Sequence, residues 1–554
     1  MRSFRRRSFS LSRSLLPYLA MGFAGCVAEA PGPETATTQG THDDLVTLFN
    51  DWREFESPEF VDGVPDYTAS AMRAQHEELA TWRARLESFD TSGWSVPEQV
   101  DWHLLRAEMN GLDFDHRVRQ PWVRDPAFYV SVYAAESDVP AHEGPVIHGW
   151  IDTWMYDYPL SAQDATELAD RIGAIPSLLE QARGNLTGNA QDLWMAGFRS
   201  FAGQSADLDA LSEQVAGTDP ALGAAITAAK DATDSFVDWL RAEAPSKTGP
   251  SGVGKANYSW YMRNVHLVPY GWDEMVTLMR RELARAHSSL RLEENRNRDL
   301  PQLDRIASSQ EYDRRLNEAV TDYMEFLEAE EIHLITEWMD PALRAVNGQF
   351  TPAAPGEIRN FFSEVTYRDP LAMRTHMHHW IELARMRENP HPSPIRAVPS
   401  LYNIFDHRSE GLATAVEEMF MHAGLFDDRP RTRELIWIMV AQRAARALSG
   451  LYLHGNEFTM EEAVQHATDW TPRGWLPDGD LVRNEQHLYL RQPGYGTSYL
   501  SGKVQMEELM AERAIQLGDE FTVGRFFDEI FATGVIPFSL TRWEMTGTRD
   551  EILN

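Results

Sequence analysis

The chain has 554 residues and is strongly acidic, with 84 Asp and Glu against 51 Lys and Arg and a formal net charge of −33. Such a field repels nucleic acids and anionic membrane surfaces, so we expect no nucleic-acid partner. With 43% hydrophobic residues and 17 Trp, the composition is also far from that of a disordered protein. The only cysteine is Cys26, which excludes a disulfide within one chain.

The first 25 residues have the features of an export signal. Five positive residues precede the first acidic one, namely Arg2, Arg5, Arg6, Arg7 and Arg13. The apolar stretch over residues 15–25 is shorter than the ~20 residues that cross a bilayer as a helix, which favours a signal-peptide core. Phe23-Ala24-Gly25-Cys26 resembles the lipobox of bacterial lipoproteins and predicts a lipid on Cys26. The alternative is a cleaved secretory signal followed by an incidental cysteine. Arg6-Arg7 with Ser8-Phe9-Ser10-Leu11 resembles a twin-arginine export signal.

Removal of residues 1–25 takes away those five arginines and no acidic residue, so the mature chain has a formal charge of −38. Residues 26–41 are rich in Pro, Gly, Ala and Thr and predict a flexible tether. No later segment is long and apolar enough to span a membrane, so the lipid is the expected anchor. We therefore expect a lipoprotein of the cell envelope, exposed to the periplasm or the exterior.

The remaining residues, 42–554, predict a mainly α-helical protein. Ser161 and Asp164 have the spacing of a capping box, followed by apolar residues three or four positions apart, Leu168, Ile172, Ile175 and Leu179. The same periodicity follows Gly271, at Trp272, Val276, Met279 and Leu283. No second linker interrupts the chain. We expect one large domain with two lobes around a central cleft.

Two familiar motifs are incomplete and a third is absent. Residues 249–255 have the glycine and lysine spacing of a phosphate-binding loop, but Ala256 stands where a Ser or Thr must bind magnesium. His142, Glu143 and His148 could form a metal group, yet Gly144 and Pro145 make a regular helix there unfavourable. A loop is predicted at both places. No Gly-x-Ser-x-Gly nucleophile motif exists.

The densest group of chemically active residues lies between residues 374 and 418. The segment 374–390 predicts one helix, on which His376, His378, His379 and Glu382 fall within an arc of about 160°. Imidazoles three or four residues apart can share a metal, and a carboxylate from another helix can complete the site. Glu410 and Glu417, seven residues apart, share a face of the next helix. A site for a metal such as zinc would be built from His376, His378 or His379 together with Glu410. The alternatives are a metal-free cleft and ordinary buried histidines with hydrogen-bond partners.

The sequence resembles the bacterial domain-of-unknown-function family 885, which looks like a distant relative of thermolysin-like zinc peptidases, and its C-terminal motifs carry the resemblance. Glu410-Gly411 with Glu417 is similar to its Glu-Gly-Trp-Ala-x-x-x-Glu helix. Residues 446–454 and 459–463 match the next block. Gln492-Pro493-Gly494, Ser498-Tyr499 and Gly502 match a Pro-Gly-x-x-x-Ser-Tyr-x-x-Gly pattern, and Leu517-Gly518 with residues 526–534 closes the resemblance. It covers nearly the whole mature chain and implies a gluzincin-like fold.

The zinc helix departs from the family pattern, His-Glu-x-x-Pro-Gly-His-His. If His378 and His379 are its last two residues, Ala372 and Met373 replace the metal ligand and the general base. His376 could substitute as a ligand, with Glu382 or Glu417 as the base. The resemblance further suggests Arg446, His454 and Tyr499 as residues that hold a substrate carboxylate or an oxyanion.

These observations predict a lipid-anchored hydrolase acting on peptides or small amides. One alternative is a catalytically inactive relative that binds a peptide or another ligand in the same cleft. A third is a metal-independent enzyme that uses the histidines for acid–base chemistry.

Overall fold

The computed structural model describes residues 40–554 except residue 355. The signal peptide, Cys26 and almost all of the tether lie outside these residues. The first helix, α1 (His42–Glu56), begins where Thr41 accepts a hydrogen bond from the backbone N–H of Asp44 and closes a capping box. In the part of the chain that the structure describes, no helix has both the length and the hydropathy to cross a membrane.

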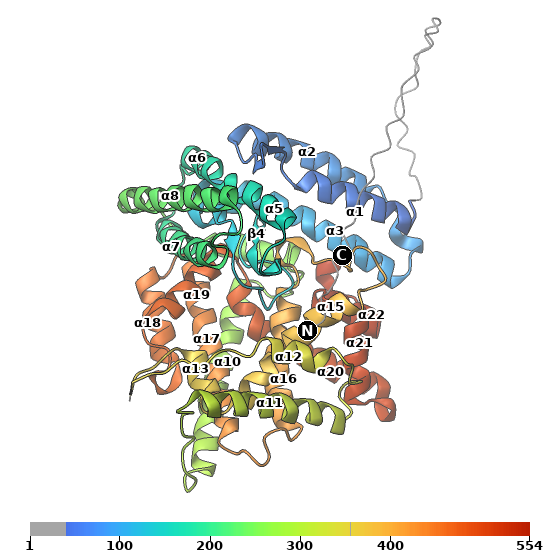
Figure 1. Ribbon diagram of the computed structural model, residues 1–554. Helices are drawn as coiled ribbons and strands as arrows, with labels where there is room; N and C mark the ends of the chain where they lie inside the picture. Colours follow the sequence, from blue (N-terminus) through green and yellow to red (C-terminus); the bar gives the residue numbers. More distant parts are fainter. Residues whose placement is uncertain (1–39, 355) are drawn as a thin grey trace, which may run out of the picture.

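The prediction of a mainly helical single domain is confirmed (Figure 1). The N-terminal helices are α1, α2 (Ala69–Glu87), α3 (Val96–Phe114), α4 (Pro121–Arg124), α5 (Ala162–Gly173), α6 (Ile175–Asn185), α7 (Gln191–Gln214) and α8 (Pro220–Glu243). The middle helices are α9 (Lys255–Asn264), α10 (Trp272–Arg296), α11 (Ser309–Ala329), α12 (Met339–Ala345), α13 (Phe361–Thr366), α14 (Pro370–His376) and α15 (His378–Glu388). The C-terminal helices are α16 (Asp406–His422), α17 (Thr432–His454), α18 (Met460–Trp470), α19 (Asp480–Arg491), α20 (Tyr495–Leu517), α21 (Val523–Ala532) and α22 (Phe538–Thr546).

Among the described residues, the strands form two small two-stranded sheets. Strands β1 (Phe60–Val61) and β2 (Val64–Pro65) pair antiparallel. Strands β3 (Val132–Tyr133) and β4 (Ile151–Asp152) pair parallel, and they bracket a long loop over residues 134–150. This loop contributes side chains to the functional site.

The hydrophobic core is divided into two main clusters. The smaller one is built from residues 64–244, and α5, α6, α7 and α8 lie together at the upper left of Figure 1. The larger one joins α1 and α3 to the helices from α9 onward. Apolar side chains at helical spacing explain both clusters, because each amphipathic helix must bury its apolar stripe against another element.

The two helix starts expected from the sequence are observed. Ser161 accepts a hydrogen bond from the backbone N–H of Asp164 at the start of α5. That helix ends at Gly173, and Pro176 lies in the first turn of α6, so the apolar series spans two helices rather than one. Helix α10 begins at Trp272, and its four predicted apolar residues are buried.

Helices α16 and α20 pack with their backbones in contact through Gly411 and Gly502. A Cβ atom added at Gly502 would lie 2.0 Å from the carbonyl oxygen of His407 and 2.7 Å from the Cα of Gly411. No side chain fits at either position. These are two of the glycines in the motifs that the sequence shares with family 885, and their role is this close approach.

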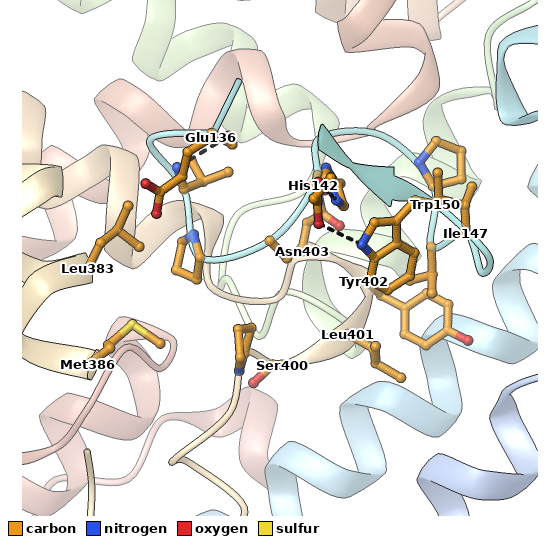
Figure 2. A pocket seen from close by; sticks show the side chains of 18 of the residues that line it. Glu136, His142, Ile147, Trp150, Leu383, Met386, Ser400, Leu401, Tyr402 and Asn403 are labelled. Atoms are coloured by element: carbon orange, nitrogen blue, oxygen red, sulfur yellow. Dashed lines mark hydrogen bonds and ion pairs between the residues drawn. The ribbon is translucent and has the colours of Figure 1, made fainter. Parts of the chain in front are cut away.

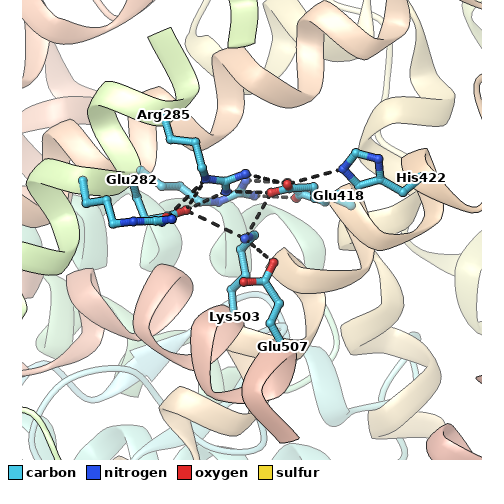
Figure 3. Close-up of polar contacts among 9 residues, drawn as sticks. Glu282, Arg285, Glu418, His422, Lys503 and Glu507 are labelled. Carbon is cyan, nitrogen blue, oxygen red and sulfur yellow. Dashed lines mark hydrogen bonds and ion pairs between the residues drawn. The ribbon is translucent and has the colours of Figure 1, made fainter. Parts of the chain in front are cut away.

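A buried charge network also holds α10, α16 and α20 together (Figure 3). Arg285 of α10 makes a bidentate pair with Glu418 of α16, with distances of 2.6 and 2.8 Å. The ammonium of Lys503 on α20, which is almost fully buried, lies 3.1 Å from Glu418 and 2.5 Å from Glu507. Glu418 and its neighbour Glu417 therefore point to different sides of α16.

Candidate functional site

The single helix predicted over residues 374–390 is two helices, which separates the histidines. Helix α14 ends at His376, Met377 leaves the helical conformation with ψ near 6°, and α15 starts at His378. His376 and His379 face the same side, with ring centroids 4.9 Å apart and planes at 88°. His378 turns away from them. The prediction of one continuous helical face was wrong.

His379 and Glu410 form the centre of the site. The Nε2 atom of His379 lies 3.1 Å from Oε2 of Glu410, and its Nδ1 lies 3.1 Å from the Ser409 hydroxyl. Burial by itself lowers the pKa of His379, but the carboxylate of Glu410 outweighs it and raises the pKa to about 9. The same ion pair lowers the pKa of Glu410 against the effect of its burial. Ser409 holds the ring orientation of His379.

His376 is held on its other side by a second ion pair. Arg443 of α17 binds Glu417 with two hydrogen bonds of 2.7 Å. Oε1 of Glu417 lies 3.1 Å from Nδ1 of His376. The same Nδ1 also lies 3.2 Å from Nη2 of Arg443, while Nε2 of His376 lies 3.9 Å from Oε2 of Glu410. Both Nε2 atoms therefore lie close to the same carboxylate oxygen.

A tyrosine and a second glutamate extend the network. The Tyr495 hydroxyl lies 2.7 Å from Glu410 and 2.9 Å from Glu143 of the 134–150 loop. Burial, reinforced by the negative charges of Asp138 and Glu410, raises the pKa of Glu143 to about 7. Since a hydroxyl has one proton, Tyr495 can donate to only one of these two carboxylates at a time. Glu143 is positioned by Gln492, which accepts a 2.6 Å hydrogen bond from the backbone N–H of Gly144.

These residues border an open cavity of about 930 Å³. Its lining includes His376, Glu143, Arg443, Arg446 and Tyr499. The ring of Tyr499 lies 5.6 Å from each of the two guanidinium groups and stacks on His376 at 6.3 Å. The volume lies within the range of roughly 300–1,000 Å³ that small-molecule sites occupy. Arg446 and Tyr499 thus both line this cavity.

Three predicted site residues lie elsewhere. Nδ1 of His378 lies 3.0 Å from the Tyr323 hydroxyl, and burial lowers the pKa of His378 to about 3. Glu382 makes two hydrogen bonds with Arg408 at 2.8 and 2.9 Å in the core. His454 donates to the carbonyl oxygen of Tyr489. The predicted roles of these residues were wrong, because none of the three side chains faces the cavity. His378 cannot serve there as a metal ligand, and neither Glu382 nor His454 can serve there as a catalytic group.

Glu417 also needs a correction. Its two oxygens are occupied by Arg443, and it is fully buried. A carboxylate held in this way orients His376 and cannot take a proton from a water molecule in the cavity. Its place beside the site is as predicted, and its role as a base is not.

One group of described residues has the geometry of a metal site. Ligand atoms of Asp138, His376 and His379 lie within 4.8 Å of one another. Two imidazoles with carboxylates form a donor set that suits zinc, and two ligands of a tetrahedral zinc lie about 3.3 Å apart for bonds of ~2.0–2.1 Å. The Oε2 atom of Glu410 lies 3.1 and 3.9 Å from the two Nε2 atoms, near that spacing. The donor set is therefore of a kind that could hold a metal ion.

The incomplete motifs have structural roles. Residues 249–254 form a loop before α9, and the Lys255 ammonium pairs with Glu457 and lies 3.8 Å from the ring centre of Trp272. His142 pairs with Asp152 and His148 with Glu56, each at 3.2 Å, so these two histidines do not share a ligand.

The loop that bears Asp138 and Glu143 has a second cavity on its other side (Figure 2). This cavity measures about 470 Å³ and is mainly apolar, with Ile147 and Trp150 on one side and Leu383 and Met386 of α15 on the other. Asp138 and Glu143 line a third cavity of about 530 Å³, which shares Glu136 and His142 with the apolar one. The loop is therefore bordered by open space on both faces.

Two solved structures are similar to this one over almost the whole chain. The first is described as "a putative lipoprotein of unknown function from Shewanella oneidensis". It is 16% identical, has a TM-score of 0.64, and the match covers 91% of this chain and 97% of that chain. The second, "the putative lipoprotein from Colwellia psychrerythraea", is 12% identical with a TM-score of 0.61, and covers 92% and 99%. At such low identities the likeness concerns the fold.

No curated protein matches the chain. The family model described as "Bacterial protein of unknown function (DUF885)" matches residues 33–364 and 378–545. His379, Glu410 and Tyr499 lie within the match, whereas Ala372, Met373 and His376 lie in the unmatched segment between its two parts. The positions at which the family's His-Glu pair is replaced thus lie in α14, outside the matched ranges. Because the matched ranges make up most of its length, the chain belongs to the bacterial family of unknown function DUF885.

Proposed function

We propose that this protein is a lipid-anchored hydrolase of the cell envelope that binds zinc and acts on peptides or small amides. The observation that carries the proposal is the convergence of Asp138, His376 and His379, with Glu410, beside a cavity large enough for such a substrate. The lipid anchor is supported by the lipobox at Cys26 and by the two similar structures, each of which is described as a "putative lipoprotein". A gluzincin-like arrangement of two lobes around a cleft fits the two hydrophobic clusters.

Each side chain has a distinct role in this proposal. Zinc would polarise the substrate carbonyl and lower the pKa of a bound water. His376 and His379 would hold the metal, while Glu417 and Ser409 lie beside the Nδ1 atoms and orient the two rings. Glu143 is the acid–base group in place of the missing family glutamate, because it lines the cavity and shares a proton with Tyr495. Arg443 and Tyr499 supply donors for an oxyanion.

A binding protein without catalysis is the second candidate. The observation that favours it is that both glutamates expected as bases are held by arginines, Glu382 by Arg408 and Glu417 by Arg443. In that case the cavity binds a peptide or another ligand and releases it unchanged. The metal-independent alternative would use the His379–Glu410 pair as its acid–base unit.

Metal content of the purified protein tests the proposal. After incubation with zinc and removal of excess metal, we expect close to one zinc per chain, measured by mass spectrometry of the element. His379→Ala is expected to lose it, because a ligand is removed. His378→Gln, one residue away but outside the site, is the matched control and is expected to keep it. Zinc-free wild-type protein, or equal loss in both variants, would refute the metal site.

Turnover then separates the two candidates. A zinc-loaded protein that cleaves members of a peptide library supports the hydrolase. A zinc-loaded protein that binds peptides without cleaving them supports the binding protein.

A further inference from the structure

The cavity beside His376 has a second polar region, contributed by α7 and α19. Arg199 and Ser200 of α7 line it together with Asp480, Asn484 and His487 of α19. Among the described residues, no hydrogen bond or ion pair joins this region to the groups proposed to bind the metal.

Arg199 differs from the other arginines of the cavity. Arg443, Arg446 and Arg491 each have a carboxylate partner, namely Glu417, Glu485 and Asp125. Among the residues that the structure describes, Arg199 has no ion pair, and its Nη1 atom is buried without a hydrogen-bond partner. Leaving a buried N–H donor of a charged group without a hydrogen-bond partner is unfavourable. A ligand that supplies an acceptor would therefore stabilise the guanidinium of Arg199.

His487 lies in the same region and is also without partners. Its side chain is 5% exposed, and neither ring nitrogen makes a hydrogen bond. Burial, followed by the positive charges of Arg199 and Arg483, lowers the pKa of His487 to about 3. The neutral ring offers one N–H donor and one lone pair. A ligand that supplies both an acceptor and a donor would satisfy it.

The acidic groups around Arg199 do not pair with it, because most of them already pair with another arginine. These pairs are Glu461 with Arg483, Asp478 with Arg483, and Glu485 with Arg446. Asp480 is the first residue of α19, where the positive end of the helix dipole favours its charge. Arg199 therefore remains available for an anion.

We propose that Arg199 and His487 form a subsite for a carboxylate of the substrate, with the adjacent amide N–H of that substrate donating to the imidazole of His487. This inference rests on the proposed function and narrows its substrate class to peptides or small amides with a free carboxylate. The carboxylate accepts from the guanidinium of Arg199, and the rest of the substrate extends along the cavity toward His376 and Tyr499. A simple anion would satisfy Arg199 alone, since it has no amide N–H for His487.

The test compares a carboxylate with its neutral amide. N-acetyl-alanyl-alanine and its C-terminal amide are titrated into zinc-loaded protein, with binding followed by calorimetry. The acid is expected to bind about tenfold to a hundredfold more tightly, as a charge-assisted hydrogen bond provides. Arg199→Gln is expected to remove this preference and to keep its zinc. Arg241→Gln, on α8 and outside the cavity lining, is the control and is expected to keep both.

The outcomes distinguish this subsite from the metal site. Equal binding of acid and amide to the wild type, a preserved preference in Arg199→Gln, or no binding of either compound at millimolar concentration would overturn the subsite. Zinc content would not change in any of these cases. Inorganic phosphate that competes as well as the acid would show a general anion site and would overturn the part assigned to His487.

Discussion

The contact between Gly411 and Gly502 gives a sharp test of how the site is assembled. In Gly502→Ala, the new methyl group would lie 2.0 Å from the carbonyl oxygen of His407 and 2.7 Å from the Cα of Gly411. Both neighbours are backbone atoms, so no change of rotamer relieves the contact. Ordinary carbon–oxygen contact requires about 3.4 Å, so α16 and α20 must separate by more than 1 Å.

The magnitude follows from two opposing effects. Overpacking of a well-packed interface costs about 1–3 kcal/mol, and the contact at Gly502 belongs to the upper end of that range. Alanine recovers about 1 kcal/mol through its higher helix propensity. The free energy of unfolding should therefore fall by about 2 kcal/mol. The separation should also lengthen the 2.7 Å hydrogen bond between Tyr495 of α20 and Glu410 of α16.

Chemical denaturation followed by circular dichroism measures the stability, and zinc titration measures the site. Gly223→Ala in α8 is the matched control, because a Cβ atom added at Gly223 would have no neighbouring atom within 4 Å. The control should gain about 0.5–1 kcal/mol. A Gly502→Ala protein as stable as the wild type, with unchanged zinc affinity, would refute the argument that this contact sets the spacing of the two helices.

Three further predictions follow from the buried polar groups. Lys503→Met should destabilise the protein by about 3 kcal/mol in the same denaturation assay, the lower end for removing one partner of a buried ion pair, because Arg285 remains beside Glu418. Lys230→Met, at a solvent-exposed pair on α8, should leave the stability almost unchanged, and an equal effect of both variants would contradict the role of the network. Burial lowers the pKa of His454 to about 4, below the 6.5 of the unfolded chain. Burial of the neutral His454 ring therefore makes its full contribution to the free energy of unfolding above pH 6.5. This contribution, about 3 kcal/mol, is lost as the pH falls to about 4. His454→Gln should flatten the stability profile over this window, and an unchanged slope would show that His454 does not titrate as stated. Glu143→Gln should keep zinc and lower the turnover of any cleaved peptide by about 10²–10⁴-fold, and full activity would exclude Glu143 as the acid–base group.

Much of the helical framework could be predicted from local sequence. Ser161 begins α5 and Trp272 begins α10, because capping and apolar periodicity act within a few residues of each helix start. Glu410 and Tyr499 were identified from their motifs, and both lie at the site. The glycines of the shared motifs could be recognised, but their purpose became clear only when α16 and α20 were seen in contact.

The break at Met377 was missed. No proline or glycine stands there, and the residues favour a continuous helix. The family pattern contained the signal, since its Pro-Gly pair falls on His376 and Met377 when His378 and His379 are placed on its last two histidines. Tertiary packing imposes the break without the residues that usually cause it, and this sends His378 to Tyr323 and His376 toward Glu410.

The sequence by itself determined the helical class and the acidic charge, and it pointed to His379 and Glu410 among the candidate site residues. These follow from composition, from periodicity and from short motifs, all of which act over a few residues. Only the tertiary structure decided that Asp138 and Glu143 join the site, more than 200 residues before His376, and that Arg443 holds Glu417. The physical reason is that convergence of distant segments depends on how helix faces pack, and local preferences do not encode that arrangement.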